Sequence, residues 1–395
     1  MKKLSLSILL SLSVLAATFL VLELAARILV ERPQTITIED LESDVPSGGK
    51  QTIETRRFAD RALYVKTPTG LRLKTNAHVV VRNHAVSKRD IEITTNSHGF
   101  RHAELGEKTE DEFRILVLGD SITFGGSVNQ DETYPARIGR HLEDRPPSFL
   151  DGKNIQVVNA GIGSIDLQNE FAVLMDKGLD VEPDVVLVGL YLNDANASLY
   201  LKVTRLPSLL QRSRFLGFVA NRFDVLRARY RSAGEVADTD YQLERKEFLK
   251  RNRSAEVDWS TDERGFNMLI SVAFKDWGYA WSDAYWEKVQ EILELMQEAS
   301  QSEGFELVVL LFPVAQQVHA EILKDEPQRK FEALMQDLEI EHLSLLPALR
   351  EKYRRDRANV FFDQCHPTVE GNDFVGQEVA AFLARTLECR RGRCA

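Results

Sequence analysis

The chain has 395 residues, of which 44% are hydrophobic, and a formal net charge of -10. This length and composition can supply the core of one large or two moderate domains, so a folded chain is expected rather than a disordered one. The acidic balance argues against nucleic acid as a partner, because phosphate binding needs a basic surface.

The first segment, residues 1–32, is predicted to be a transmembrane anchor. Residues 4–22 carry no charge, and at about 1.5 Å per residue a helix of this length spans roughly the 30 Å hydrocarbon core of a bilayer. The alternative is a cleaved signal peptide, with Ala16 or Ala26 before the cut. Both interpretations place the rest of the chain outside the cytoplasm, either tethered in the periplasm or at the cell surface, or secreted.

Residues 33–110 are polar and contain the short β-type runs HVVVRN and IEITTNSHGF, which predict a β-rich N-terminal extension. Apolar runs separated by helical patterns follow: FRILVLG, IQVVNAG, DVVLVGLYLND and FELVVLLFP. Such runs indicate a parallel sheet that is covered on both faces. The predicted class is therefore α/β, with the main domain formed by residues 111–194 and 281–388.

Residues 195–280 interrupt this alternation as a charged, helical insertion, which is a candidate lid. Within it, the segment 205–231 combines apolar residues at helical spacing with many arginines. It predicts either a lid helix packed on the main domain or a basic amphipathic helix that touches anionic headgroups or an anionic glycan.

The chain has three cysteines. Cys389 and Cys394 both lie in the C-terminal tail, residues 389–395, and could form a small disulfide loop in an oxidising compartment. That pairing would leave Cys365 as a free, buried residue.

Polar clusters follow three of the predicted strands, at the edge where open α/β sheets bind ligands. These clusters are Asp120 and Ser121, residues 159–164, and Asn193 with Asp194. Near the C-terminus, the stretch FFDQCHPTVEGN contains Asp363 and His366. An aspartate can fix the tautomer of a histidine, whose other nitrogen then takes a proton from a serine hydroxyl. Ser121, Asp363 and His366 are therefore a candidate nucleophile, orienter and base.

Four blocks, GDSIT, NAGIGS, YLND and DQCHP, resemble in the same order the signature blocks of the SGNH (GDSL-type) hydrolase superfamily. The extension TTNSHGFRHAE resembles that of a bacterial membrane-tethered branch. The resemblance implies a flavodoxin-like three-layer α/β/α sandwich and ester hydrolysis without a metal or an organic cofactor. It also implies that Ser121, Asp363 and His366 are catalytic.

The same resemblance implies three donors to an oxyanion, namely the N–H of Ser121, an N–H in the glycine block and the side chain of Asn193. The position of the usual donor glycine falls on Ser164, directly after Gly163, so either residue can supply the N–H. Tyr191 stands where the family commonly has glycine, which would narrow the pocket.

All four tryptophans fall within one 28-residue window: Trp259, Trp277, Trp281 and Trp286. They either pack the insertion onto the core or form a stacking wall for a sugar ring or an acyl chain. Trp277 and Trp281, together with Tyr191, are the candidates for such a wall.

We therefore expect a serine esterase that cleaves small acyl esters through an acyl-enzyme, with O-acetyl groups on a carbohydrate as the favoured substrate. One alternative is an O-acyltransferase with the same triad. Another is a noncatalytic carbohydrate-binding protein on the same fold. The sequence leaves the natural acyl group and the oligomeric state open.

Overall fold

The computed structural model describes residues 2–29, 34–40, 51–55, 63–84, 86–195, 213, 215–216, 218–219, 259–274 and 276–390. Within these ranges, the structure describes only the backbone of residues 2–10, 12, 34–40, 51–55, 66 and 389–390. The hypothesis for residues 205–231 and the pairing of Cys389 with Cys394 therefore lie mostly outside the described residues.

A five-stranded parallel sheet forms the centre of the fold. Its strands are β7 (Glu112–Gly119), β8 (Asn154–Asn159), β9 (Val185–Tyr191), β10 (Glu306–Phe312) and β11 (Glu341–Ser344), in the order β11-β10-β9-β7-β8. This is the strand order of flavodoxin-like sheets, so the predicted α/β class is confirmed. The four predicted runs form β7 to β10. The edge strand β11, whose four residues are all half-buried, lacks the apolar run that would have predicted it.

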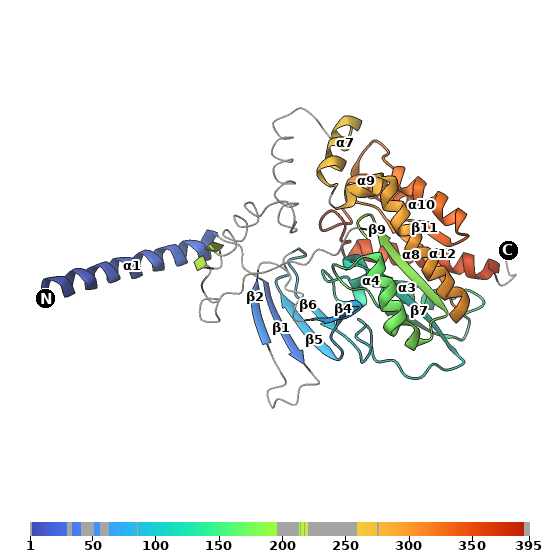
Figure 1. The fold of residues 1–395 in the computed structure, drawn as a ribbon, viewed down its shortest axis with the longest axis horizontal. Helices are drawn as coiled ribbons and strands as arrows, with labels where there is room; N and C mark the ends of the chain where they lie inside the picture. The colour runs from blue at the N-terminus through green and yellow to red at the C-terminus, as the bar shows by residue number, and fades with distance from the viewer. Residues whose placement is uncertain are drawn as a thin grey trace.

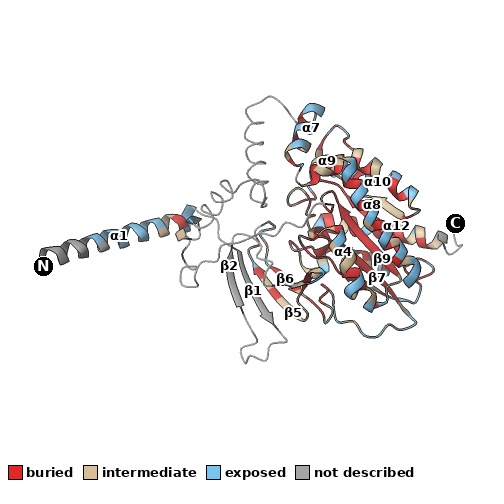
Figure 2. Cartoon of the chain, viewed as in Figure 1, coloured by how far each residue is buried: buried red, intermediate tan, exposed pale blue. Residues whose placement is uncertain are grey.

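Helices cover both faces of this sheet (Figure 1). α3 (Tyr134–Asp144) packs against α12 (Val369–Arg390), and α4 (Leu167–Val173) packs against α8 (Asp283–Glu303). Because parallel crossovers are right-handed, the reversal of strand order beside β7 sends these two pairs to opposite faces. Every residue of β9 is buried between the two helical layers (Figure 2). The sheet is thus the middle layer of three.

Shorter elements complete the main domain. The helices are α2 (Ser121–Phe124), α7 (Glu263–Val272), α9 (Ala315–His319), α10 (Glu326–Asp337) and α11 (Leu346–Asp356). Single turns are η2 (Gln130–Glu132), η3 (Leu174–Gly178), η4 (Leu179–Val181) and η5 (Trp277–Trp281).

The segment before the main domain is rich in strands. β1 (Gln34–Asp40), β2 (Gln51–Thr55), β5 (Ala77–Arg82) and β6 (Ile91–Thr94) form an antiparallel sheet, and β3 (Tyr64–Thr67) pairs with β4 (Gly70–Leu73). Alternate residues of β5 are buried, and they belong to the same hydrophobic core as the central sheet. The extension therefore packs directly onto the main domain.

Arg101 joins this extension to the loop that follows α2. Its side chain is 1% exposed, and its guanidinium donates to the carbonyl oxygens of Phe124 (2.6 Å), Gly125 (2.7 Å) and Val128 (2.7 Å). Burial lowers the pKa of Arg101 to about 9, which keeps the group charged at neutral pH. One charged side chain thus binds three buried carbonyl groups.

The predicted N-terminal helix is present as α1 (Lys2–Leu29), which extends away from the other elements (Figure 1). Near its end, Glu23 accepts hydrogen bonds from Ser213 Oγ (2.7 Å) and from the backbone N–H of Phe215 (3.1 Å). In the described part of the chain, no helix has both the length and the apolar character that crossing a membrane requires.

Replacing Arg101 by leucine should lower the free energy of unfolding by about 3 kcal/mol or more, because the three carbonyl groups lose a charged donor. Urea unfolding followed by circular dichroism measures this loss. The matched control is Arg82→Leu, which removes an exposed ion pair with Asp90 (2.8 Å) and should change stability little. Equal losses in the two variants would contradict the role of Arg101.

Candidate active site

The end of β7 places Ser121 at the first residue of a helix. Gly119 adopts a φ of +153°, and a Cβ atom there would collide with Thr123, so the sharp turn from strand to helix needs glycine. Asp120 caps α2 by accepting the backbone N–H of Ile122 (2.8 Å). The half-buried Ser121 hydroxyl is therefore fixed at the carboxyl edge of the sheet.

Asp363 and His366 come from the loop that precedes α12. Asp363 Oδ1 accepts the backbone N–H groups of Cys365 (3.0 Å) and His366 (2.9 Å), so the loop itself fixes the carboxylate. Asp363 Oδ2 lies 2.8 Å from His366 Nδ1, and His366 Nε2 lies 3.0 Å from Ser121 Oγ. The structure thus brings the three predicted residues into one hydrogen-bonded chain.

The pKa shifts of Asp363 and His366 agree with this arrangement. Burial alone would raise the pKa of Asp363, but the neighbouring His366 and the backbone N–H donors outweigh it and hold that pKa well below its usual range. Burial alone would lower the pKa of His366, but Asp363, and after it Asp120 and Asp276, raise it. The pair therefore favours a charged carboxylate beside a basic imidazole.

Two residues of the glycine block lie in different settings. Gly163 is buried, and a Cβ atom on it would be 3.9 Å from Ser121 Cβ and 2.7 Å from Tyr64 Oη. Ser164 is exposed and has a φ of +65°, in the left-handed region. That backbone conformation explains why glycine is usual at this position. Gly163 is the residue that the structure places against Ser121.

Asn193 lies on the turn after β9 and is half-buried. Its side-chain Nδ2 donates to Asp276 Oδ1 at 3.1 Å. Asp276 lies between α7 and η5, in the part of the predicted insertion that returns to the main domain. The sequence interpretation did not single out this aspartate.

The GDSL-like lipase/acylhydrolase family model matches residues 115–379. The chain belongs to this family. It is therefore an enzyme that hydrolyses esters. A search of curated proteins found no match.

Several solved structures resemble this GDSL-like hydrolase at low identity. A two-domain esterase active on acetylated mannans is 12% identical with a TM-score of 0.39, over 69% of this chain and 49% of that one, so the chain spans about half of its length. A putative lipolytic protein of the G-D-S-L family from Desulfitobacterium hafniense DCB-2 is 14% identical with a TM-score of 0.35, over 68% and 99%. An acetyl xylan esterase is 13% identical with a TM-score of 0.37, over 68% and 98%.

The residues expected as a substrate wall of this hydrolase are packed inward. Tyr191 and Trp277 are each 1% exposed, so neither presents a ring face to solvent. Trp281 is half-buried; its ring contacts Trp277, and its Nε1 donates to Glu326 at 3.2 Å. These contacts are those of residues that pack the insertion onto the core.

A buried histidine from the extension also lies near the triad. His84 is 3% exposed, and its Nδ1 accepts the backbone N–H groups of Val86 (3.4 Å) and Ser87 (3.3 Å), which places its proton on Nε2. Burial, and then the charge of His366, lowers the pKa of His84 to about 4, so it is neutral at physiological pH. No motif marks His84, because its neighbours in the site come from distant parts of the sequence.

Among the described residues, one group has the spacing of metal ligands, with the ligand atoms of Asp363, Cys365 and His366 within 4.8 Å of one another. Two of these residues already pair with each other in the triad. Burial raises the pKa of the Cys365 thiol well above its usual range, so a thiolate ligand is disfavoured. The group fits the hydrolase triad better than a metal centre.

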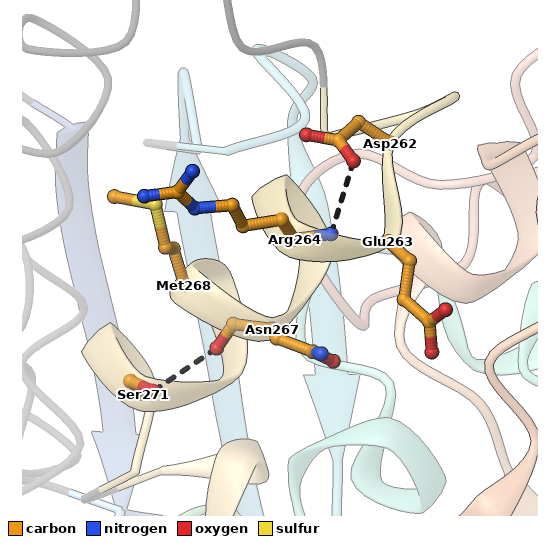
Figure 3. A pocket seen from close by; sticks show the side chains of 6 residues that line it. All are labelled: Asp262, Glu263, Arg264, Asn267, Met268 and Ser271. Carbon is orange, nitrogen blue, oxygen red and sulfur yellow. Dashed lines mark hydrogen bonds between the residues drawn. The ribbon is translucent and has the colours of Figure 1, made fainter.

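A surface hollow runs along one side of α7 (Figure 3). Its lining residues all come from this helix and its cap: Asp262, Glu263, Arg264, Asn267, Met268 and Ser271. It includes no residue of the triad or of the predicted oxyanion donors.

Gly163→Ala should cost about 1–3 kcal/mol of stability, because the new methyl group would press on Tyr64 Oη. In the double variant with Tyr64→Phe, the nearest ring atom would lie 3.9 Å from that methyl, and most of the loss should be recovered. Thermal unfolding of the two single variants and the double variant measures the coupling. Additive losses would contradict the contact.

Proposed function

We propose that this hydrolase is a serine esterase that removes small acyl groups, with O-acetyl groups on a carbohydrate as its substrate. The observation that carries the proposal is the hydrogen-bonded chain from Ser121 Oγ through His366 to Asp363, with distances of 3.0 and 2.8 Å. A serine hydroxyl bound to an oriented imidazole is an activated nucleophile.

In the proposed reaction, Ser121 Oγ attacks the ester carbonyl while His366 Nε2 takes the hydroxyl proton. The imidazolium, stabilised by Asp363, then gives this proton to the departing alkoxide, which leaves an acyl-enzyme that water hydrolyses by the same route. The oxyanion would accept from the N–H of Ser121, from the amide of Asn193 and from a glycine-block N–H, for which proximity to Ser121 favours Gly163.

The surroundings of the triad support a short acyl group and a polar alcohol. Tyr64 Oη leaves no room for even one methyl group on Gly163, which limits the space on this side of Ser121. Asp276 and Asn193 border the site from the insertion and from β9. Carboxylate and amide groups hydrogen-bond readily to sugar hydroxyls, whereas a long acyl chain would need an apolar surface.

Ser121→Ala should abolish release of acetate from an acetylated polysaccharide and leave the fold intact, because a half-buried hydroxyl contributes little to stability. The control is Ser302→Ala on α8, near the opposite edge of the sheet, which should retain full activity. Free acetate is measured with and without an acceptor glycan. Ser121→Ala activity within about tenfold of wild type would refute the nucleophile, and acetyl transfer to the acceptor would identify a transferase.

We also propose that the enzyme is tethered to a membrane with its catalytic domain outside the cytoplasm, on the basis of the uncharged run at residues 4–22. The full-length chain should sediment with membranes and stay there after a high-salt or carbonate wash, whereas a chain that lacks residues 1–32 should be released. Recovery of the full-length chain in the soluble cytoplasmic fraction would contradict the proposal.

A further inference from the structure

We infer that Asp276 is a positioning residue, which holds the side-chain amide of Asn193 with its NH₂ end available to the oxyanion. The inference rests on the proposed function, in which Asn193 is an oxyanion donor. Its starting point is the hydrogen bond of 3.1 Å from Asn193 Nδ2 to Asp276 Oδ1.

An asparagine needs such a partner to act reliably as a donor. The terminal torsion of asparagine is broad and roughly two-fold, so the amide can present either its oxygen or its NH₂ group in the same direction. An ionised carboxylate only accepts hydrogen bonds, and it therefore selects the NH₂ end of the amide. One N–H of Asn193 then binds Asp276, and the second N–H on the same nitrogen remains for the oxyanion.

Asp276 is held in place by the tryptophan-rich segment. Its backbone N–H donates to Ala273 O (2.9 Å), and the N–H of Gly278 donates to the same oxygen (2.8 Å). Trp277, the next residue, is 1% exposed and packs edge-on against Trp281, with ring centroids 5.5 Å apart. The buried rings thus anchor the carboxylate that contacts Asn193.

Asp276 also acts on the charge of the base. Charged or titratable groups face His366 from several elements. Asp363 and the Cys365 thiol, whose Sγ lies 3.5 Å from His366 Nδ1, come from its own loop. Asp120 lies at the start of α2, Asp276 before η5 and His84 after β5. The negative charge of Asp276 raises the pKa of His366. The base acts in its neutral form, so removal of that charge should move the acidic limb of kcat/KM to lower pH.

The experiment measures kcat and KM of a small acetyl ester for Asn193→Ala, Asp276→Ala, the double variant and Asp276→Asn. Asn193→Ala should lower kcat about 10²- to 10³-fold with little change in KM. Asp276→Ala should lower kcat about tenfold or more, and the double variant should be no slower than Asn193→Ala, because Asp276 acts through Asn193.

Asp276→Asn keeps an acceptor oxygen of the same shape but removes the charge. Its new NH₂ group can also face Asn193, so the variant no longer selects one end of that amide. It should lower kcat less than Asp276→Ala does, and it should shift the acidic limb of kcat/KM to lower pH. The matched control is Asp283→Ala, which removes a carboxylate that is 87% exposed and pairs with Lys330. That variant should match wild type in kcat and in pH profile.

Wild-type or faster turnover in Asp276→Ala, while Asn193→Ala is impaired, would overturn the positioning role and leave the proposed function intact. Losses that add in the double variant would overturn it as well. Wild-type turnover in Asn193→Ala would instead remove the oxyanion role of Asn193 from the proposed function, and this inference with it. If Asp276→Ala fails to fold, wild-type kcat in a folded Asp276→Asn overturns the inference.

Discussion

The reversal of strand order at β7 is the constraint on which the site depends. β8 and β9 lie on either side of β7 because the chain crosses over in opposite directions after the first two strands of the sheet. In open α/β sheets, the loops on the two sides of such a point diverge, and ligands bind there at the carboxyl ends of the strands. Ser121, Gly163 and Asn193 each follow one of these three strands, so the topology alone brings a nucleophile and its neighbours to one edge.

Much of this arrangement was predictable from the sequence, because its signals are local. Four buried strands appear as apolar runs, and the nucleophile turn and the Asp-x-x-His loop are short motifs whose residues contact one another. Asp363 accepts N–H groups only two and three residues away. By contrast, Tyr64 against Gly163 and Asn193 against Asp276 are contacts between distant segments. No periodicity or spacing encodes such pairs, since they depend on how the extension and the insertion pack.

The tryptophans show how packing decides between two sequence interpretations. Their composition suits both a core and a sugar-binding wall, because an indole ring is large, flat and partly polar. Trp277 is buried, and the Nε1 atoms of Trp281 and Trp286 donate to Glu326 (3.2 Å) and to Ala280 O (2.8 Å). These side chains therefore pack against and hydrogen-bond to other residues of the protein. We expect them to affect the reaction by fixing the position of Asp276, which directly precedes η5 and binds Asn193.

The buried carboxyl groups of this region differ in the direction of their pKa shifts. Burial raises the pKa values of Asp120, Glu170 and Asp194, and neither oxygen of Glu170 has a hydrogen-bond partner among the described residues. Asp363 is also largely buried, but two N–H groups and His366 bind it and lower its pKa. Asp120 and Asp194 each accept a backbone N–H, from Ile122 (2.8 Å) and from Tyr191 (2.6 Å), yet burial still raises their pKa values. At Asp363 the adjacent His366, together with two N–H donors, outweighs burial and favours the charged carboxylate. The charged form of Asp363 is therefore favoured, and it orients the imidazole and stabilises the imidazolium that forms when Ser121 attacks.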